Sequence, residues 1–456
     1  MTKRLSVVKI SLGLTGLDPA TCFERLAGEN GRGYLIEKNE EGRRRAWIGV
    51  EPFETLRVIK GRLYAVTARG KKKIPGEPFA ALGERLAKIQ TRGGRPFDAG
   101  AVGLLDYEMI RHLEPVHMNA NVDEGFMMLF NATVIVENGR ATLSALASGA
   151  SGRRRAEKLA VSLKTILRGA SAVPPPALPK QPLPLKPGRG RATFLKRVAK
   201  IKKHIVAGDV FQAVLSEPFE GRVEAGVFGV YRAVRAANTT PYGFCLIDGD
   251  RAWIGASPER LVRVENGVAR NCPIAGTRPR GATRAKDLKL EKELRADEKE
   301  RAEHLMLVDL ARNDLGRVCA PGSVEVARFM ITRRFSNVMH LVSEVEGRLD
   351  KGMTAWDALV ASFPAGTVSG APKVRAMEII AGLERVTRGF YAGAVVQADF
   401  AGNLDSCLAI RSLELRGPIV RLQAGAGIVA DSKPASEWNE VLHKLAGLRR
   451  ALKGAP

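Results

Sequence analysis

Phe363-Pro-Ala-Gly-Thr-Val-Ser-Gly-Ala-Pro-Lys373 is the stretch of this chain that says most about its fold and chemistry. Two glycines and two prolines fix its backbone, and an apolar-periodic segment that predicts a helix over 373–381 follows it. Two further segments have the same character, Pro273-Ile-Ala-Gly-Thr-Arg278 and Gln423-Ala-Gly-Ala-Gly427. Both leave main-chain N–H groups free to bind an anion. Together the three segments indicate an enzyme that acts on a small molecule.

The size of the chain and its termini narrow the classes of protein. At 456 residues and 49.3 kDa the chain exceeds the usual size of one domain. Its apolar runs fall well short of the roughly 18 residues that suggest a membrane span. The N-terminus lacks the apolar region of a secretory signal, so we expect a cytoplasmic protein without a membrane segment. The five cysteines are scattered and form no C-x-x-C pair, which suits reduced core residues.

The charge is unusual, because 72 Lys and Arg against 48 Asp and Glu give a net charge of +24. A basic nucleic-acid-binding protein is therefore the non-enzyme alternative. Aromatic residues make up only 6% of the chain, and no zinc-finger or RNA-binding signature occurs. A solvated surface that steers an anionic substrate explains the charge better.

Seven prolines between residues 170 and 191 divide the chain. They exclude a helix and favour an extended spacer, so we assign an N-terminal region to 1–170, a proline-rich linker to 171–191 and a catalytic domain to 192–456. Expected helices span 80–89, 154–167, 194–207, 226–237, 290–310, 354–362, 373–381 and 436–452. Expected strands span 45–50, 55–65, 132–145, 244–247, 252–255, 408–415 and 419–424. Helices grouped against antiparallel strands predict an α+β fold of layered antiparallel sheets flanked by helices.

Two pairs of glutamates are candidate ligands for a divalent ion. Glu300 and Glu303 are three residues apart on an expected helix and share one of its faces, and Glu437 and Glu440 repeat this spacing at the start of another helix. Carboxylate oxygens without a matching cysteine or histidine cluster would suit Mg²⁺. From the spacing alone, exposed helix charge is the simpler explanation.

Three other side chains stand out by their surroundings. His340 lies between apolar neighbours, where an imidazole can carry a proton, although a satisfied core histidine fits the same pattern. Glu259 follows an expected strand. It could act as a general acid, or it could be a surface residue of a Ser-Pro turn. Arg411 interrupts an apolar strand, where its guanidinium needs an anionic partner, either a substrate carboxylate or an internal one.

In their order along the chain, these motifs resemble those of the chorismate-utilising enzymes. This family includes anthranilate synthase component I, aminodeoxychorismate synthase, isochorismate synthase and salicylate synthase. The resemblance spans about residues 194–452 and rests on the three loops, on Glu303-His-Leu-Met-Leu-Val-Asp-Leu-Ala-Arg-Asn-Asp314 and on Val338-Met-His-Leu-Val342. The N-terminal region is matched loosely, around Tyr34-Leu-Ile-Glu37.

Two positions bear on the reaction that the resemblance implies. Isochorismate- and salicylate-forming members carry a lysine that activates water where this chain has Gln212, and aminodeoxychorismate synthases commonly carry a nucleophilic lysine where it has Ala275. The sequence therefore most resembles anthranilate synthase component I, in which ammonia adds to C2 of chorismate, the C4 hydroxyl leaves and pyruvate is eliminated. A lyase of tryptophan biosynthesis is the expected function, with aminodeoxychorismate synthase component I of the 4-aminobenzoate and folate pathway as the alternative.

The resemblance also implies roles for single residues. Glu303 and Glu440 would ligate Mg²⁺, with Glu300 and Glu437 beside them. Glu259 would protonate the departing C4 hydroxyl, His340 would handle protons and Thr367 would donate a hydrogen bond to the ring. The residues expected to hold a chorismate carboxylate are Tyr391, Arg411 and the backbone of Gly425, Ala426 and Gly427.

Partners and regulation follow from the same resemblance. Because none of the five cysteines lies in a Gly-x-Cys-x-Gly turn, ammonia would come from solution or from a separate glutaminase subunit, anthranilate synthase component II. We therefore expect a hetero-oligomer. Tryptophan inhibits family members through two elements that correspond to Leu35-Ile-Glu-Lys38 and Asn238-Thr-Thr-Pro-Tyr-Gly243. The effector serine and methionine are replaced in this chain, so the sequence leaves feedback inhibition open.

Overall fold

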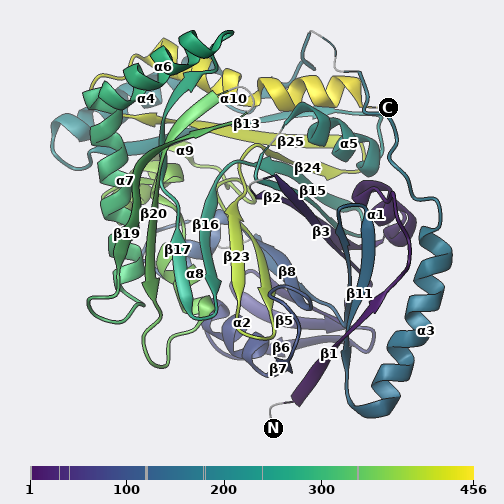
Figure 1. Ribbon diagram of the computed structural model, residues 1–456. Helices are drawn as coiled ribbons and strands as arrows, with labels where there is room; N and C mark the ends of the chain where they lie inside the picture. Colours follow the sequence, from purple (N-terminus) through teal and green to yellow (C-terminus); the bar gives the residue numbers. More distant parts are fainter. Residues whose placement is uncertain are drawn as a thin grey trace.

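Two large sheets form the centre of the protein (Figure 1). The computed structural model describes residues 3–455 except 30, 41, 119–121, 178, 180, 239 and 336–337. Sheet A has 13 strands in the order β12-β13-β25-β24-β15-β14-β2-β3-β10-β11-β1-β7, with β21 paired to β13. Sheet B has 12 strands in the order β18-β20-β17-β16-β23-β22-β8-β9-β4-β5-β6, with β19 paired to β20. Among the described strands, β1 and β7 pair in parallel and all other pairs are antiparallel.

The strands of sheet A are β12 (Lys186–Pro187), β13 (Gln212–Arg222), β25 (Ile419–Ile428), β24 (Ser412–Arg416), β15 (Arg251–Ser257), β14 (Tyr242–Asp248), β2 (Arg32–Glu40), β3 (Arg43–Val50), β10 (Ala132–Glu137), β11 (Arg140–Ala147), β1 (Lys3–Ser11), β7 (Ile89–Arg92) and β21 (Gly370–Ala371). Those of sheet B are β18 (Ile274–Pro279), β20 (Val338–Arg348), β17 (Val268–Asn271), β16 (Arg260–Glu265), β23 (Leu404–Leu408), β22 (Ala394–Asp399), β8 (Gly100–Leu105), β9 (Asp123–Leu129), β4 (Glu54–Ile59), β5 (Arg62–Thr67), β6 (Gly70–Ile74) and β19 (Glu325–Arg334).

The helices are α1 (Pro19–Ala27), α2 (Pro78–Ala87), α3 (Gly149–Leu167), α4 (Arg191–Val206), α5 (Val227–Ala237), α6 (Arg284–Ala296), α7 (Glu298–Gly316), α8 (Ala355–Ser362), α9 (Lys373–Glu384) and α10 (Pro434–Gly454), with short 3₁₀ helices η1 (Tyr107–His112) and η2 (Gly366–Val368). Mixed helices and antiparallel sheets confirm the predicted α+β class. No helix in the described part of the chain is long and apolar enough to cross a membrane.

Alternating side chains build two hydrophobic cores. Along β2, Tyr34 and Ile36 face sheet B, whereas Leu35 points to the opposite face. The first core fills the space between the sheets. The second lies between sheet A and the helices α1, α3, α4, α5, α9 and α10, and Figure 1 shows α10 along the β13–β25 part of this sheet.

Both sheets combine strands from the two sequence regions. In sheet A, β14 pairs with β2, so that Tyr242 lies opposite Lys38. In sheet B, β22 pairs with β8, so that Ala394 lies opposite Leu105. The regions 1–170 and 192–456 therefore share both sheets. Their division into separate domains around a linker at 171–191 stays a prediction.

Most expected helices and strands occur, with ends that shift by a few residues. The exceptions are segments expected to be continuous. The helix expected over 290–310 is two helices, because the Asp297 side chain accepts hydrogen bonds from the N–H groups of Lys299 and Glu300, both at 3.1 Å, and so caps a new helix. The strands expected over 55–65 and 132–145 are hairpins, with Asn138 and Gly139 at positive φ in the second turn.

The strand expected over 408–415 is also interrupted. β23 ends at Leu408 and β24 begins at Ser412, and Arg411 between them has a φ of 50°. The two strands belong to different sheets. The chain therefore crosses from sheet B to sheet A at Arg411, which brings this side chain to the space between them.

Candidate active site

A cavity of about 820 Å³ lies where sheets A and B, α7 and α10 meet. It is lined by segments from all three glycine-containing loops. Eleven of the thirteen residues predicted for the site line it, namely Gln212, Glu259, Glu303, His340, Thr367, Tyr391, Arg411, Gly425, Gly427, Glu437 and Glu440. The sequence motifs therefore converge on one place.

The loop 363–373 enters the cavity through close backbone packing. A Cβ atom on Gly366 would lie 2.0 Å from Leu310 Cδ2 of α7, and one on Gly370 would lie 2.2 Å from the Gln212 carbonyl oxygen. Only glycine fits at position 370, where the obstacle is backbone and φ is 143°, whereas a side chain at position 366 would displace the Leu310 side chain. The loop is further held by Lys373, whose Nζ donates to Asp314 Oδ1 at 3.0 Å.

Glu259 is a carboxyl group suited to give up a proton near neutrality. It follows β15, and Thr367 Oγ1 donates a hydrogen bond of 2.6 Å to its Oε1. Burial raises the pKa of Glu259 to about 7, against the opposing effects of the Thr367 hydrogen bond and the positive charge of Lys444. The carboxyl group can therefore keep its proton at a pH well above that at which an exposed glutamate ionises.

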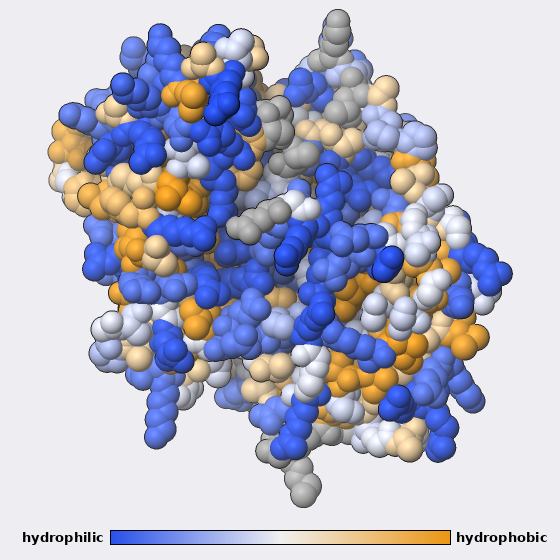
Figure 2. All heavy atoms as spheres, in the orientation of Figure 1, coloured by the Kyte–Doolittle hydropathy of each residue, from blue (hydrophilic) through white to orange (hydrophobic). Residues whose placement is uncertain are grey.

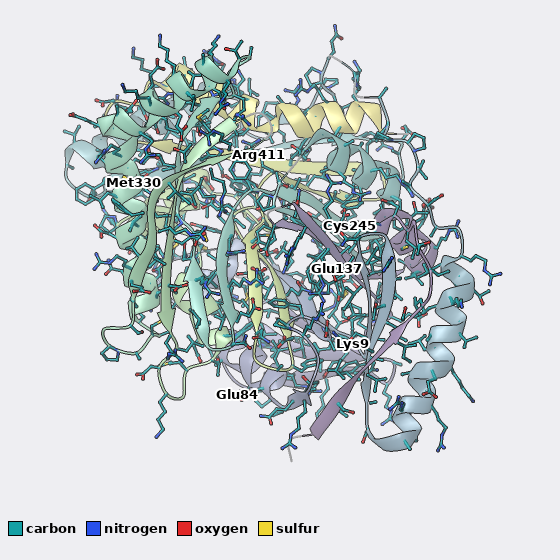
Figure 3. All side chains as sticks on the ribbon, viewed as in Figure 1. Lys9, Glu84, Glu137, Cys245, Met330 and Arg411 are labelled. Atoms are coloured by element: carbon teal, nitrogen blue, oxygen red, sulfur yellow. The ribbon has the colours of Figure 1, made fainter. Side chains whose placement is uncertain are left out.

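Arg411 brings a cation to the same cavity. Figure 3 labels this residue beneath α10, and its side chain is exposed to solvent in the cavity. Its guanidinium forms no ion pair with any described carboxylate, although it is close enough to Tyr391 and Glu440 to be affected by their charges. Burial lowers the pKa of Arg411. A guanidinium that lines the cavity without a carboxylate partner among the described residues favours an anion from outside.

Tyr391 and Gly425 form the wall beside Arg411. Tyr391 is buried, and a Cβ atom on Gly425 would lie 2.8 Å from its hydroxyl oxygen and 2.9 Å from the Leu215 carbonyl oxygen. Glycine at position 425 therefore keeps the β25 backbone open to the cavity. Gly427 lies beside Gln212, because a Cβ atom there would lie 2.4 Å from Gln212 Nε2.

His340 is a neutral imidazole in this cavity. Burial lowers its pKa, and the positive charge of Arg411 acts in the same direction. Its Nδ1 lies 2.8 Å from the Gly276 carbonyl oxygen, which can only accept a hydrogen bond, and 3.1 Å from Thr277 Oγ1. We therefore assign the proton to Nδ1, which leaves Nε2 as the nitrogen that can accept a proton.

The four predicted metal ligands differ in their partners. Arg278 Nη1 donates to Glu300 Oε1 at 3.0 Å, and Lys444 Nζ lies 2.8 Å from Glu440 Oε1. Glu303 has no ion pair among the described residues, and burial and the charges of Glu300 and Glu440 raise its pKa. Burial also raises the pKa of Glu437. Across the described ranges, no three His, Cys, Asp or Glu side chains are arranged to hold a metal by themselves.

These carboxylates fit a cation that is only partly coordinated by protein. Glu303 carries a charge that its neighbours repel, and a divalent ion would relieve this repulsion. Mg²⁺ commonly takes one or two carboxylates and completes its shell with water and substrate oxygens. The donor set thus suits Mg²⁺ with Glu303 and Glu440 as ligands.

Two predicted residues do not line the cavity. The Ala426 side chain is fully buried in the core beneath α10, because neighbouring residues of a strand face opposite sides. Glu300 lies behind Gly276, whose Cβ would be 3.3 Å from Glu300 Oε2. Only the backbone of Ala426 and the charge of Glu300 can act on a ligand in the cavity.

Sequence reasoning missed Lys444 and Arg388. Lys444 lines the cavity one helical turn after Glu440, and this spacing is a signal that a search for ion pairs would find. Arg388 is 1% exposed, and its guanidinium donates to the carbonyls of Val368 and Val214, both at 2.7 Å, and to Glu384. It ties η2 to β13 beneath the cavity, through contacts that no local sequence pattern reveals.

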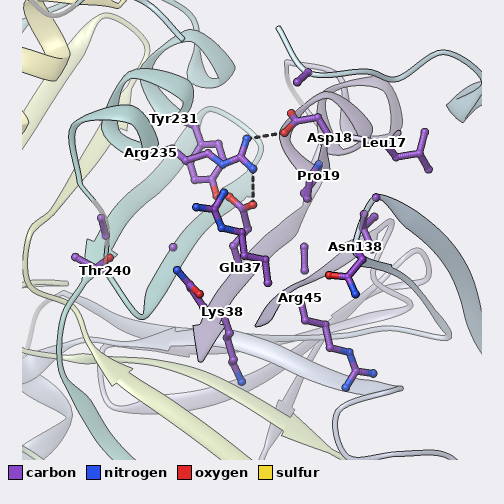
Figure 4. A pocket seen from close by; sticks show the side chains of 18 of the residues that line it. Leu17, Asp18, Pro19, Glu37, Lys38, Arg45, Asn138, Tyr231, Arg235 and Thr240 are labelled. Carbon is purple, nitrogen blue, oxygen red and sulfur yellow. Dashed lines mark hydrogen bonds and ion pairs between the residues drawn. The ribbon is translucent and has the colours of Figure 1, made fainter. Parts of the chain in front are cut away.

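A second pocket, of about 380 Å³, contains the first of the two effector-like elements (Figure 4). In it Glu37 Oε1 accepts a hydrogen bond of 2.8 Å from Arg235, which also donates to Asp18. Lys38 points to the other face of β2, where its Nζ lies 2.7 Å from Asp405 Oδ2 and 4.5 Å from the centre of the Phe97 ring. Thr239 of the second element lies outside the described residues.

Comparisons with known proteins find relatives over almost the whole chain. The family model described as chorismate binding enzyme matches residues 33–450. Anthranilate synthase component 1 of Streptomyces coelicolor is 40% identical over 463 aligned positions, which cover 96% of this chain and 87% of that protein. The protein of the same name from Bacillus subtilis is 37% identical, with 96% and 90% covered.

Solved structures show the same fold. The crystal structure of anthranilate synthase component I from Streptococcus pneumoniae TIGR4 matches with a TM-score of 0.78 and 35% identity, over 89% of this chain and 92% of that chain. The menaquinone-specific isochorismate synthase of Escherichia coli matches with a TM-score of 0.76 at 22% identity, over 98% and 94%. The second match supports the fold alone.

Proposed function

The chain belongs to the chorismate binding enzymes, and on this premise we propose that it is the chorismate-using component of an anthranilate synthase. The reaction would convert chorismate and ammonia to anthranilate, pyruvate and water, as a step of tryptophan biosynthesis. The observation that carries the proposal is the cavity itself, which holds an acid with a pKa of about 7, Glu259, together with the unpaired Arg411 and Glu303.

The first step needs a nucleophile, a proton and a fixed substrate. Ammonia forms a bond to C2, both ring double bonds shift by one position, and the C4–O bond breaks. Hydroxide is a poor leaving group, so the hydroxyl departs as water with the proton of Glu259. Thr367 orients the Glu259 carboxyl through its hydrogen bond. Arg411 and Tyr391 bind one carboxylate of chorismate, with the open β25 backbone beside them.

In the second step the proton on C2 is lost and pyruvate leaves, so that the ring becomes aromatic. The bond between the ring and the enolpyruvyl oxygen breaks, and the enolpyruvyl methylene carbon gains a proton. Neutral His340, with Nε2 free to accept, is the group we assign to proton handling. Its Nδ1 hydrogen bond to the Gly276 carbonyl fixes the orientation of the ring.

We further propose that Glu303 and Glu440 hold Mg²⁺, with Glu300 and Glu437 beside them. The ion would neutralise and orient the ring carboxylate of chorismate. Support comes from the unpaired charge of Glu303 and from the oxygen-only character of the donor set.

Two residues of the cavity argue against the other reactions expected in this family. Gln212 and Ala275 both line the cavity. A neutral amide at position 212 is no base for water, and a methyl group at position 275 is no nucleophile. Ammonia is therefore the nucleophile we propose, delivered by a glutamine amidotransferase subunit in a hetero-oligomer or taken from solution. The cytoplasmic location stays a prediction.

A product assay tests the proposal. Purified protein with chorismate, Mg²⁺ and ammonium should form fluorescent anthranilate and an equal amount of pyruvate. Accumulation of aminodeoxychorismate without pyruvate would contradict the assignment and favour the 4-aminobenzoate pathway. Salt-dependent nucleic-acid binding as the only activity would favour the non-enzyme alternative.

A substitution of Glu303 tests the proposed metal site. Glu303→Gln removes one ligand charge and should lower Mg²⁺-dependent turnover by roughly 100-fold or more, since charge stabilisation by the ion is lost. Glu298→Gln is the matched control, because Glu298 lies in the first turn of the same helix and does not line the cavity. Unchanged activity of Glu303→Gln would exclude this residue as a ligand.

A further inference from the structure

A small second cavity adjoins the active site at Glu259. Its volume is about 30 Å³, and Glu259 and Thr367 line both this small cavity and the large one. The rest of its lining includes Ser362 at the end of α8, Asp314 of α7 and apolar side chains such as Leu310. Both helices pack on sheet B (Figure 1). The proposed acid therefore faces the substrate cavity and the small cavity at once.

The size and the chemistry of the small cavity fit a water molecule. A volume of about 30 Å³ has room for one or two water molecules and is far too small for chorismate. Water is held in buried cavities that offer it two to four polar groups, whereas apolar cavities stay empty. The polar side chains that line this cavity are Glu259, Thr367, Ser362, Asp314, Arg260 and Asn271.

Ser362 provides the observation that points to a ligand. Its side chain is fully buried, and its Oγ forms no hydrogen bond with any described residue. A buried hydroxyl group is destabilising unless another group satisfies it, and most such groups in proteins have a partner. Because Ser362 lines the small cavity, a water molecule there can be that partner.

The two carboxyl groups of the small cavity can accept further hydrogen bonds. Lys373 Nζ donates to Asp314 Oδ1 at 3.0 Å and to Oδ2 at 3.1 Å, and Thr367 Oγ1 donates to Glu259 Oε1 at 2.6 Å. An ionised carboxylate offers about four lone-pair sites, so neither group is saturated. A water molecule bound to Ser362 Oγ can therefore donate a hydrogen bond to Glu259.

We propose that the small cavity binds a water molecule that Ser362 holds in place and that donates a hydrogen bond to Glu259 once this residue has lost its proton. The inference rests on the proposed function. As the C4 hydroxyl takes the proton, negative charge develops on the Glu259 carboxyl, and a donor already oriented toward it stabilises this charge. The bound water itself is not consumed. Ser362 is thereby a positioning residue, because it acts on the acid through the water and does not line the substrate cavity.

Other groups also act on the ionisation of Glu259. Burial raises its pKa to about 7, whereas the Thr367 hydrogen bond and the charge of Lys444 on α10 lower it. Tyr391 is close enough to be affected by the charge of Glu259. The charged groups of the small cavity have partners of their own, Asp314 with Lys373 and Arg260 with Glu40 and Asp405.

Replacing Ser362 leaves all of these groups in place. The exposed charges that make the face in Figure 2 largely hydrophilic are screened by solvent and act equally on each variant. A change in the ionisation of Glu259 would therefore report on the water.

Crystal structures of the unaltered chain and of Ser362→Ala test the site. In the unaltered chain we expect a water molecule within hydrogen-bond distance of Ser362 Oγ and of a Glu259 carboxyl oxygen. In Ser362→Ala this water should be lost or displaced. A small cavity without water in the unaltered chain, or the same water in both structures, would overturn the inference. This measurement does not depend on turnover.

The pH dependence of kcat tests the role of the water. In Ser362→Ala the ionised form of Glu259 is less stabilised, so its pKa rises and the alkaline fall in kcat should begin roughly half a pH unit higher. A weaker acid also protonates the leaving group less readily, so kcat below that fall should decrease roughly threefold. The KM for chorismate should not change, since Ser362 does not line the substrate cavity.

Ser144→Ala is the matched control. Ser144 is also fully buried and its Oγ has no partner among the described residues, but it lies on β11 and lines neither cavity. Its pH profile should coincide with that of the unaltered enzyme. If the Ser362→Ala profile coincided with it too, the proposed role of the water would be wrong while anthranilate formation stood. Water at this site in a chain that forms no anthranilate would refute the proposed function and the role of the water, but not the site.

Discussion

Thr367→Val separates the role of Glu259 as an acid from the general shape of the cavity. The substitution keeps a β-branched side chain and removes the hydroxyl that donates to Glu259 Oε1 at 2.6 Å. That hydrogen bond stabilises the ionised carboxylate, so its loss favours the protonated form. Because a hydrogen bond to a charged group contributes about 1.5–3 kcal/mol and a pKa change of one unit corresponds to about 1.4 kcal/mol, the pKa of Glu259 should rise by roughly one unit above its value of about 7.

The pH dependence of kcat measures this change. Glu259 acts in its protonated form, so kcat falls as the pH rises above the pKa that applies in the substrate complex. With saturating chorismate and Mg²⁺ and a constant concentration of free ammonia, the alkaline fall in Thr367→Val should begin roughly one pH unit higher than in the unaltered enzyme. The KM for chorismate should also rise, since Thr367 is the residue proposed to contact the ring.

Thr277→Val provides the matched control. Thr277 lines the same cavity, but its hydroxyl contacts His340 Nδ1 at 3.1 Å and has no hydrogen bond to Glu259. Its alkaline limb should coincide with that of the unaltered enzyme. If the Thr367→Val limb also coincided with it, or moved to lower pH, then Glu259 would not be the acid whose ionisation limits the rate.

Two further outcomes follow from groups that lie elsewhere in the structure. Arg411→Met should raise the KM for chorismate roughly 100-fold, because loss of a desolvated charge partner costs about 2–5 kcal/mol, and Arg411→Lys should recover only part of this since lysine lacks the planar fork; an unchanged KM would show that Arg411 does not contact substrate. L-tryptophan at millimolar concentration should not inhibit, because the position of the effector serine holds Lys38, whose side chain is 6% exposed and is paired with Asp405 beside the Phe97 and Trp47 rings. Strong inhibition, measured as loss of anthranilate formation, would contradict this account of Lys38.

Local sequence signals predicted most helices and strands but not where the chain turns. Apolar periodicity over 373–381 and 436–452 located α9 and α10, because each helix buries one face against sheet A. The same periodicity runs across Asp297, where a side-chain cap starts a new helix. It also runs across Asn138-Gly139, although this pair is a strong turn signal. Turn chemistry outweighed periodicity in both places.

Sequence motifs predicted the residues of the candidate site but not the contacts that hold them in place. Glycine is required at position 370 by the Gln212 carbonyl oxygen, a contact between distant segments that the motif alone does not reveal. Arg388 bonds to Val214, a residue 174 positions earlier in the chain. Such contacts depend on how β13 pairs with β21 and β25, and this register is set by the whole of sheet A.

Local sequence signals did not predict that the two sequence regions share both sheets. The proline-rich stretch indicates a break in the chain, and a break in the chain is compatible with shared sheets as well as with separate ones. Pairing of β14 with β2 decides between them here, and it also brings Lys38 into contact with Asp405 of sheet B. A residue of the N-terminal region thereby joins the ion-pair network of Arg260, the neighbour of Glu259.

The side chains that line the cavity limit the reaction that it can support. Gln212 and Ala275 occupy the two positions where related enzymes are expected to carry lysine, and neither side chain can activate water or attack a ring carbon. Glu259 can donate a proton, and its acidity is adjusted by Thr367 and by Lys444. In the proposed reaction, a cavity arranged in this way would supply the acid for the departing hydroxyl, and the attacking group would be brought in. Lys444, the lysine whose charge acts on this acid, contacts Glu440 Oε1 and the Gly425 carbonyl oxygen, so protein atoms engage its nitrogen.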